Sequence, residues 1–210
     1  IIREGSDEAK YRAASAVWAL ASNNLSNKDT VAKLGGIDPL VGLLVTGSTE
    51  KSQQCVSGAL CALAVKHAEN RALIAKRLVG LLTSANTRAA DRQVRVLMTC
   101  SSFAADASLN QTALSKAGAL PPLITWLDSK EPAAQAKAAE TVLCAIADNS
   151  STQNLCVDAG GIQALITLVR GLSKNPPKGT ADTQSYVAPL FAARALWHLA
   201  SQTDTQAAIV

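Results

Sequence analysis

Aromatic residues, charge clusters and long apolar runs are all scarce in this sequence of 210 residues. Phe, Trp and Tyr together make up only 3% of it, and no stretch approaches the roughly 18 consecutive apolar residues of a membrane-spanning helix. The net charge is only +4, without a run of four Lys or Arg, which argues against a dedicated nucleic-acid-binding protein. Because 48% of the residues are apolar and alanine is abundant, the composition predicts closely packed helices in an all-α fold rather than disorder.

Paired cysteine motifs are missing as well. The cysteines occur in apolar helical patterns without any C-x-x-C spacing: Cys55, Cys61, Cys100, Cys144 and Cys156. Zinc sites and disulfide frameworks need paired spacings, so we expect no metal site and buried free thiols, with Cys61 in the core. Free thiols and the lack of a signal peptide predict a cytoplasmic location, with the nucleus as the alternative. Since the sequence starts at Ile1 without an initiator Met, we expect a fragment of a longer protein.

Catalytic signatures are absent too. The sequence contains no phosphate-binding G-x-x-x-x-G-K-[ST], no G-x-S-x-G, no H-E-x-x-H and no dinucleotide-binding G-x-G-x-x-G motif. The two histidines, His67 and His198, lie three repeats apart, so neither is expected to complete a Cys/His pair. We therefore predict a protein that is not an enzyme and needs no cofactor.

The sequence repeats itself at an interval of about 42 residues. Leu-Val-Gly-Leu-Leu at 40–44 recurs at 78–82, and the segment at 36–41 aligns with 119–124 and 161–166. A second motif, Ala-Leu-x-x-Leu-Ala at 59–64, recurs in related form at four further places: 16–21, 99–104, 142–147 and 195–200. Each unit predicts three helices, for example near 27–34, 39–45 and 50–66. The third helix carries one apolar face, which a single unit cannot bury, so neighbouring units must stack.

These motifs, a Gly-Gly-Ile-x-x-Leu turn followed by Ala-Leu-x-x-Leu-Ala, resemble the armadillo-repeat family, with HEAT repeats as the nearest structural relative. The resemblance implies a right-handed α-solenoid, or superhelix, of three-helix repeats forming one array over 1–210. The implied divisions are a partial repeat 1–26, complete repeats 27–69, 70–109, 110–151 and 152–203, and a partial repeat 204–210.

Two units depart from the repeat pattern. Around Lys76-Arg77-Leu78, five residues and the glycine turn are missing, so the first two helices are expected either to fuse or to pack at a different angle. In the fourth unit, additional residues rich in Pro, Gly, Lys and Ser lie within 171–184. They predict a solvated surface loop, with a binding flap as the alternative.

The resemblance also implies that third helices line a concave groove. Peptide-binding members of the importin alpha class carry an Asn there, with a Trp four residues earlier. The positions of that Asn are occupied here by Ala19, Ala62, Ser102, Ala145 and His198, so the chain is not expected to belong to this subclass. Trp18 and Trp197 stand one residue out of that register, about 100° around the helix, and are interpreted as packing between adjacent third helices.

A sparse basic stripe is expected on the same face. The candidate groove residues are Tyr11, Arg12, Ser15, Gln54, Arg95, Ser102, Lys137, Thr141, Arg194 and His198. Such a stripe would attract an acidic or phosphorylated protein segment; the alternative is that these are ordinary solvated charges.

The function that follows is a protein–protein interaction scaffold or adaptor, with a partner segment bound along the groove. A substrate-recognition array within a larger multidomain enzyme or ubiquitin ligase is one alternative. Another is a self-assembling array that oligomerises through exposed ends such as 207–210. No nucleic acid and no transmembrane segment are expected.

Overall fold

The computed structural model describes residues 4–46, 49–84, 89–174 and 184–201. Within these ranges every regular element is an α-helix, as the composition predicts, and none of the helices is long and apolar enough to cross a membrane. The chain divides into two compact units, Ile1–Asp106 and Ala107–Val210, which are described separately below.

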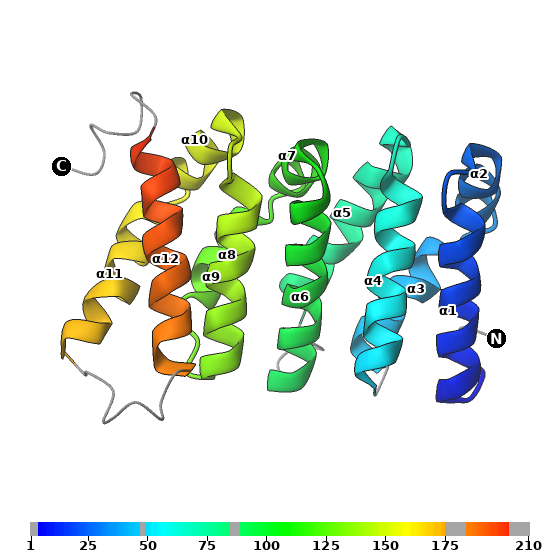
Figure 1. Cartoon of the computed structure of the whole chain (residues 1–210), viewed down its shortest axis with the longest axis horizontal. Coiled ribbons are helices and arrows are strands. Elements are labelled where there is room, and N and C mark those ends of the chain that lie inside the picture. The colour runs from blue at the N-terminus through cyan, green and yellow to red at the C-terminus, as the bar shows by residue number, and fades with distance from the viewer. Residues whose placement is uncertain (1–3, 47–48, 85–88, 175–183, 202–210) are drawn as a thin grey trace. The chain divides into compact units, whose positions relative to one another are not determined.

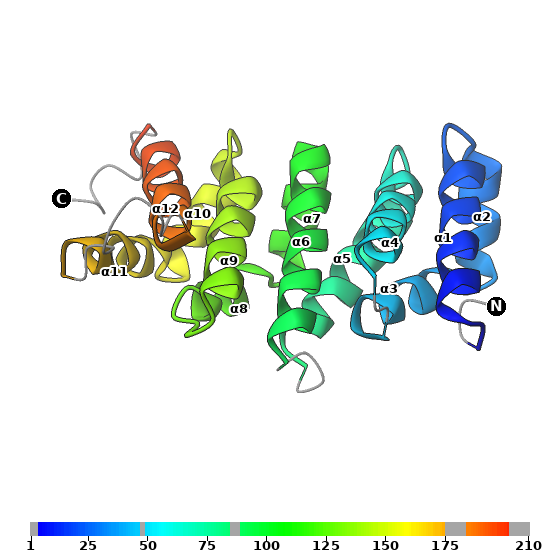
Figure 2. The same cartoon turned by 60° about the horizontal axis from the view of Figure 1, so that its bottom comes forward.

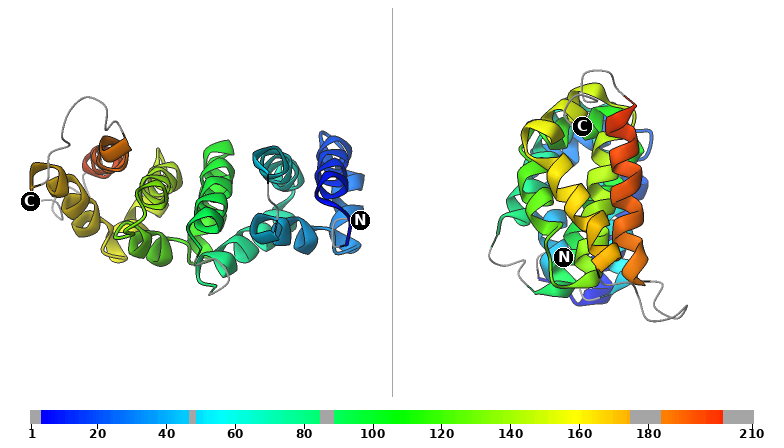
Figure 3. Two further views of the ribbon diagram at one scale, coloured as in Figure 1. Left: turned by 90° about the horizontal axis from the view of Figure 1, so that it is seen from below. Right: turned by 90° about the vertical axis from the view of Figure 1, so that its left-hand side faces the viewer.

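The first unit arranges its helices in two layers. Its helices are α1 (Asp7–Ala21), α2 (Leu25–Lys33), α3 (Ile37–Thr46), α4 (Glu50–Ala64), α5 (Ala68–Leu82) and α6 (Ala90–Asp106). Helices α1, α4 and α6 run side by side, while α3 and α5 cross behind them (Figure 1). Figure 2 and the left view of Figure 3 separate the two layers: α1 (blue), α4 (teal) and α6 (green) form one, and α3 and α5 the other.

The second unit repeats this arrangement. Its helices are α7 (Ser108–Lys116), α8 (Leu120–Trp126), α9 (Pro132–Ile146), α10 (Ser150–Asp158), α11 (Gly161–Lys174) and α12 (Gln184–Ala200). Helices α9 and α12 lie against each other, and α11 packs on α12 from the other layer (Figure 1). We call α1, α4, α6, α9 and α12 the third helices, after their place in the repeat.

The core consists mainly of leucine and alanine. Ala14 on α1 and Ala59 on α4 are fully buried, as are Ala138 on α9 and Ala195 on α12. Phe103 is the largest side chain among the fully buried ones. Alanine at these positions lets helix backbones approach closely, which explains why a chain so poor in aromatic residues still buries a core.

The helices expected at 27–34, 39–45 and 50–66 are confirmed as α2, α3 and α4, with ends shifted by about two residues. The turn after α2 depends on two glycines. Gly35 has φ +70°, in the left-handed region that favours glycine, and a Cβ on Gly36 would lie 2.8 Å from Val31 Cγ1. Gly118 and Gly160 take positive φ after α7 and α10, so the same turn recurs at the predicted interval.

Of the two outcomes expected for the deletion near 76–78, fusion is confirmed, because α5 is a single helix over Ala68–Leu82. The loop expected within 171–184 does not include the two ends of that segment, since α11 continues to Lys174 and α12 begins at Gln184. The rest of that segment, 175–183, lies outside the described residues. So do the ends of the chain, 1–3 and 202–210, on which association through exposed ends was predicted. The repeat boundaries and the right-handed superhelix stay predictions.

The turn from a third helix into the next first helix uses a recurring pair of residues. Asn24, His67 and Asn149 each cap the following helix by accepting a backbone N–H three residues on. The residue before each cap has positive φ: Asn23, Lys66 and Asp148. Because the Nδ1 atom of His67 accepts this bond, its Nε2–H donates to Asp29 at 2.7 Å, and this hydrogen bond lowers the pKa of Asp29.

Amide side chains at the start of the first helices bind the carbonyls that end the preceding third helix. Asn27 Nδ2 donates to Leu20 O at 2.8 Å, Asn70 Nδ2 to Leu63 O at 3.2 Å, and Gln153 Nε2 to Ile146 O at 2.9 Å. The last carbonyls of a helix lack partners within it, so each amide provides a hydrogen-bond donor to one of these groups, and Asn70 and Gln153 do so while buried. Asn70 also donates to Lys28 O at 3.3 Å and so joins α2, α4 and α5.

We predict that Asn149→Ala destabilises the chain more than Asn24→Ala. Both substitutions remove a helix cap, which costs about 1 kcal/mol in the free energy of unfolding. Asn149 Nδ2 additionally donates to Ser108 O at 3.2 Å and to Gln111 Oε1 at 3.1 Å, which tie α10 to α7. Losing these bonds adds about 1 kcal/mol or more. Urea unfolding of both variants measures the difference, and equal losses would contradict the proposed role of the amide.

Candidate functional site

The third helices of the first unit present a surface of small side chains. Between α1 and α4, the indole of Trp18 lies directly on the backbone of α4, because a Cβ built on Gly58 would stand 2.7 Å from its ring atoms. Trp18 nevertheless remains 42% exposed. Its interpretation as packing between third helices is confirmed. For Trp197 it is wrong, since this side chain is 67% exposed, and its ring lies edge to face with the ring of the neighbouring His198.

Two hollows flank Gly58 and Cys61 on this surface. The first, which we call the Trp18 hollow, has a volume of about 290 Å³. It is lined by Trp18, Ser22, Asn23, Lys28, Gly58, Cys61, Ala62, Val65 and Asp106. Lys28 lies at its base, 2% exposed, and its ammonium donates to Val65 O at the carboxyl end of α4. Burial lowers the pKa of Lys28, and the nearby Lys66 lowers it further.

The second, which we call the α4–α6 hollow, has a volume of about 240 Å³. It is lined by Glu50, Gln53, Gln54, Ser57, Gly58, Cys61, Met98 and Ser102. Ser57 Oγ and Thr99 Oγ1, 2.8 Å apart, join the two helices beside it. Two predicted groove residues, Gln54 and Ser102, therefore lie at one hollow, whereas Gln53 was missed. Gln53 lines this hollow because of the way α6 packs against α4, and the sequence carries no signal for that packing.

Carboxylates lie beside three members of the expected basic stripe, which itself stays a prediction. Arg12 Nε lies 2.6 Å from Glu8, Arg95 Nη1 lies 3.1 Å from Asp91, and Lys137 Nζ lies 2.6 Å from Glu140. Arg95 also donates to Leu44 O at 3.1 Å, so its guanidinium is tied to the end of α3. The sequence did carry this signal, since two of these acids stand four residues before their partners.

The remaining candidates are scattered. On α1, Tyr11 and Ser15 are half-buried, and Lys51 Nζ lies 5.1 Å from the centre of the Tyr11 ring. Thr141 is fully buried with its hydroxyl donating to Lys137 O, so placing it on the groove surface was wrong. On α12, Arg194 is exposed, and His198 Nδ1 lies 3.6 Å from Asp148. The structure gathers no single site from the ten candidates within either unit.

The five cysteines are free thiols, of which Cys55, Cys100 and Cys156 are buried, as predicted. Cys61 does not lie in the core: it is partly exposed and lines both hollows. Burial, together with the Asp106 carboxylate, raises the pKa of Cys61 to about 12. The thiol is therefore neutral near pH 7 and acts as part of an apolar wall rather than as a nucleophile.

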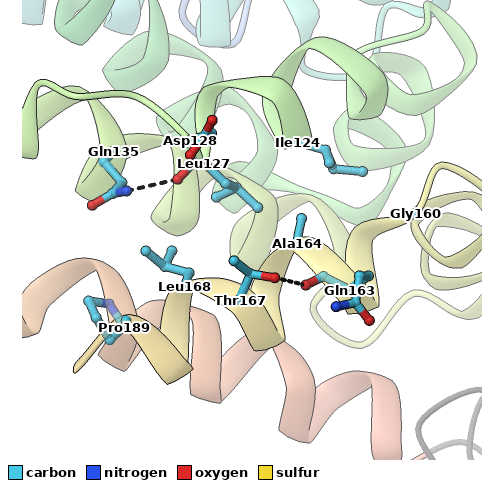
Figure 4. A pocket seen from close by; sticks show the side chains of 11 residues that line it. Ile124, Leu127, Asp128, Gln135, Gly160, Gln163, Ala164, Thr167, Leu168 and Pro189 are labelled. Carbon is cyan, nitrogen blue, oxygen red and sulfur yellow. Dashed lines mark hydrogen bonds between the residues drawn. The ribbon is translucent and has the colours of Figure 1, made fainter. Parts of the chain in front are cut away.

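The second unit has a larger cavity, of about 640 Å³, in its other layer. It lies between α8 and α11, with Gln135 of α9 and Pro189 of α12 at its edges (Figure 4). Gln135 Nε2 donates to Leu127 O at 2.9 Å, and Thr167 Oγ1 donates to Gln163 O at 2.8 Å. The polar groups are thus engaged with the backbone, and Asp128 is the one carboxylate in its described lining.

Comparisons with known proteins identify the class of the fold. No family model matches the sequence, and no curated protein matches it. Among solved structures, an engineered protein of the Northeast Structural Genomics Consortium is 25% identical, with 98% of this chain and 79% of that one aligned at a TM-score of 0.63. A designed armadillo repeat protein is 19% identical, covering 99% of this chain and 83% of its own, at a TM-score of 0.63.

A further designed armadillo repeat protein, in complex with the peptide (KR)4, is 21% identical over 94% of this chain and 78% of its own, at a TM-score of 0.59. These similarities show that the chain is an all-α repeat solenoid with an armadillo-like fold.

We predict opposite effects for two glycine substitutions within helices. Gly42→Ala on α3 meets no atom within 4 Å, so better helix propensity stabilises the chain by up to about 1 kcal/mol. Gly58→Ala pushes Trp18 off α4 and destabilises it by about 1 kcal/mol or more, because overpacking exceeds the propensity gain. Urea unfolding gives both values, and Trp fluorescence in a Trp126→Phe, Trp197→Phe background reports the displacement. A stabilising Gly58→Ala would contradict the contact.

Proposed function

We propose that this chain is an armadillo-repeat protein that binds an extended segment of a partner protein across its third helices, without catalysing a reaction. The observation that carries the proposal is the pair of hollows beside Gly58, both of which open on the third-helix surface of the first unit. At about 290 and 240 Å³, they fall below the roughly 300–1,000 Å³ of typical small-molecule sites and suit individual side chains.

The comparisons support the same role. One similar structure is a designed armadillo repeat protein in complex with a peptide, and another is of computationally designed armadillo repeat proteins for modular peptide recognition. A segment bound here would need other contacts than an asparagine ladder, because the corresponding positions in the first unit are Ala19, Ala62 and Ser102. Hydrophobic contact in the hollows and hydrogen bonds from polar rims are the interactions that this surface offers.

The sequence favours an acidic or phosphorylated partner, but the paired carboxylates beside Arg12, Arg95 and Lys137 weaken that preference. The proposal therefore requires no negative charge on the partner. The same binding surface would serve an adaptor or the substrate-recognition array of a multidomain enzyme or ubiquitin ligase.

The test is a selection of random linear peptides against the native chain, followed by fluorescence polarisation with each binder. Ser102→Arg places a long side chain at the exposed rim of the α4–α6 hollow, and we expect it to weaken binding about tenfold or more. Ser26→Arg, at an exposed position on α2, is the matched control and is expected to leave binding unchanged. A selection without binders, or equal binding by both variants, would contradict the proposal.

A further inference from the structure

The α4–α6 hollow contains a polar group without a partner. Gln53 is only 9% exposed, and its Nε2 makes no hydrogen bond among the described residues. Most buried polar groups in native proteins are hydrogen-bonded, because a buried group without a partner has lost its hydrogen bonds to water and gained none in return. Gln53 lines the hollow, so a hydrogen-bond acceptor that enters this space can bind a donor that is already desolvated.

The walls of the hollow indicate what kind of group enters with that acceptor. Gly58, Cys61 and Met98 form an apolar surface, in which Met98 has a flexible, adaptable side chain. The volume of about 240 Å³ leaves room for one aliphatic side chain rather than for a cofactor-sized molecule. An extended protein segment brings such a side chain and a main-chain carbonyl to the same place.

The negative charge at the rim of the hollow indicates the charge of the segment that binds there. Glu50 is exposed at the start of α4, and the described part of the chain shows no ion pair with it. None of the lining residues is basic, and the neighbouring Lys51 lies over the Tyr11 ring, 5.1 Å from its centre. An exposed carboxylate without an ion-pair partner attracts a basic side chain and repels an acidic one.

We propose that the α4–α6 hollow binds an extended segment in which an aliphatic side chain fills the space, a main-chain carbonyl accepts from Gln53 Nε2, and an adjacent Lys or Arg faces Glu50. This inference rests on the proposed function and deepens it, since it names the chemistry of the partner segment.

Gln53→Leu separates a binding role from a structural one. Leucine is one atom shorter but apolar, and it removes the unpaired buried amide, so the unfolding midpoint in urea is expected to stay the same or rise. Affinity for the selected peptides is expected to fall about tenfold, because one hydrogen bond to the peptide is lost. Gln163→Leu, at an exposed position on α11 in the other unit, is the matched control with unchanged affinity. A Gln53→Leu variant that loses stability but binds like the native chain would overturn the inference.

The selected peptides themselves provide the second measurement. We expect them to share an aliphatic residue next to Lys or Arg, and replacing that aliphatic residue by Asp, or the basic one by Glu, to weaken binding. The expected charge preference disappears in Glu50→Gln. Peptides that bind the third-helix surface equally well with Asp and Glu substituted would overturn the inference and leave the proposed function standing. A selection without any binder would overturn both.

Discussion

Three first helices of this chain, α2, α5 and α10, each carry an amide side chain that binds the end of the preceding third helix. Asn27, Asn70 and Gln153 all donate to a carbonyl seven residues earlier, and the carbonyl is one that no helical N–H reaches. Lys28 and Gln111 donate in the other direction, to carbonyls that end the following third helix. Helix ends that would otherwise be unsatisfied become the joints between repeats.

Because these hydrogen bonds lie at the helix ends, the sides of the third helices remain available as a binding surface. Because the helix ends are held by polar bonds, the helix sides need only small residues where they meet, and Gly58 lets Trp18 lie flat on α4. The two hollows beside Gly58 follow from the same small side chains. Recognition on such a surface depends on shape and on a few polar groups, since most of its charges are already paired with neighbours.

The repeat interval was sufficient to predict the helices and the glycine turn, because these depend on local patterns and backbone preference, whereas it left two outcomes open for α5, of which the structure shows fusion. The roles of the Asn27 and Asn70 amides could not be predicted, because their acceptor carbonyls come within reach only when the turn is built. Thr141 was misplaced because one step of helical register turns a side chain from the surface into the core. Gln53 was missed because its unpaired state depends on α6, which is distant in sequence.

Amide hydrogen exchange of the native chain and of Asn70→Leu tests the dependence on these joints most directly. Leucine fills the buried site of Asn70 but cannot donate to Leu63 O or Lys28 O. The account predicts faster exchange at Val65 and His67, whose N–H groups bond within the joint, and at the first turn of α5, while the middle of α4 keeps its protection. Unchanged exchange at these residues would show that the helices hold together without the amide, and would contradict the account.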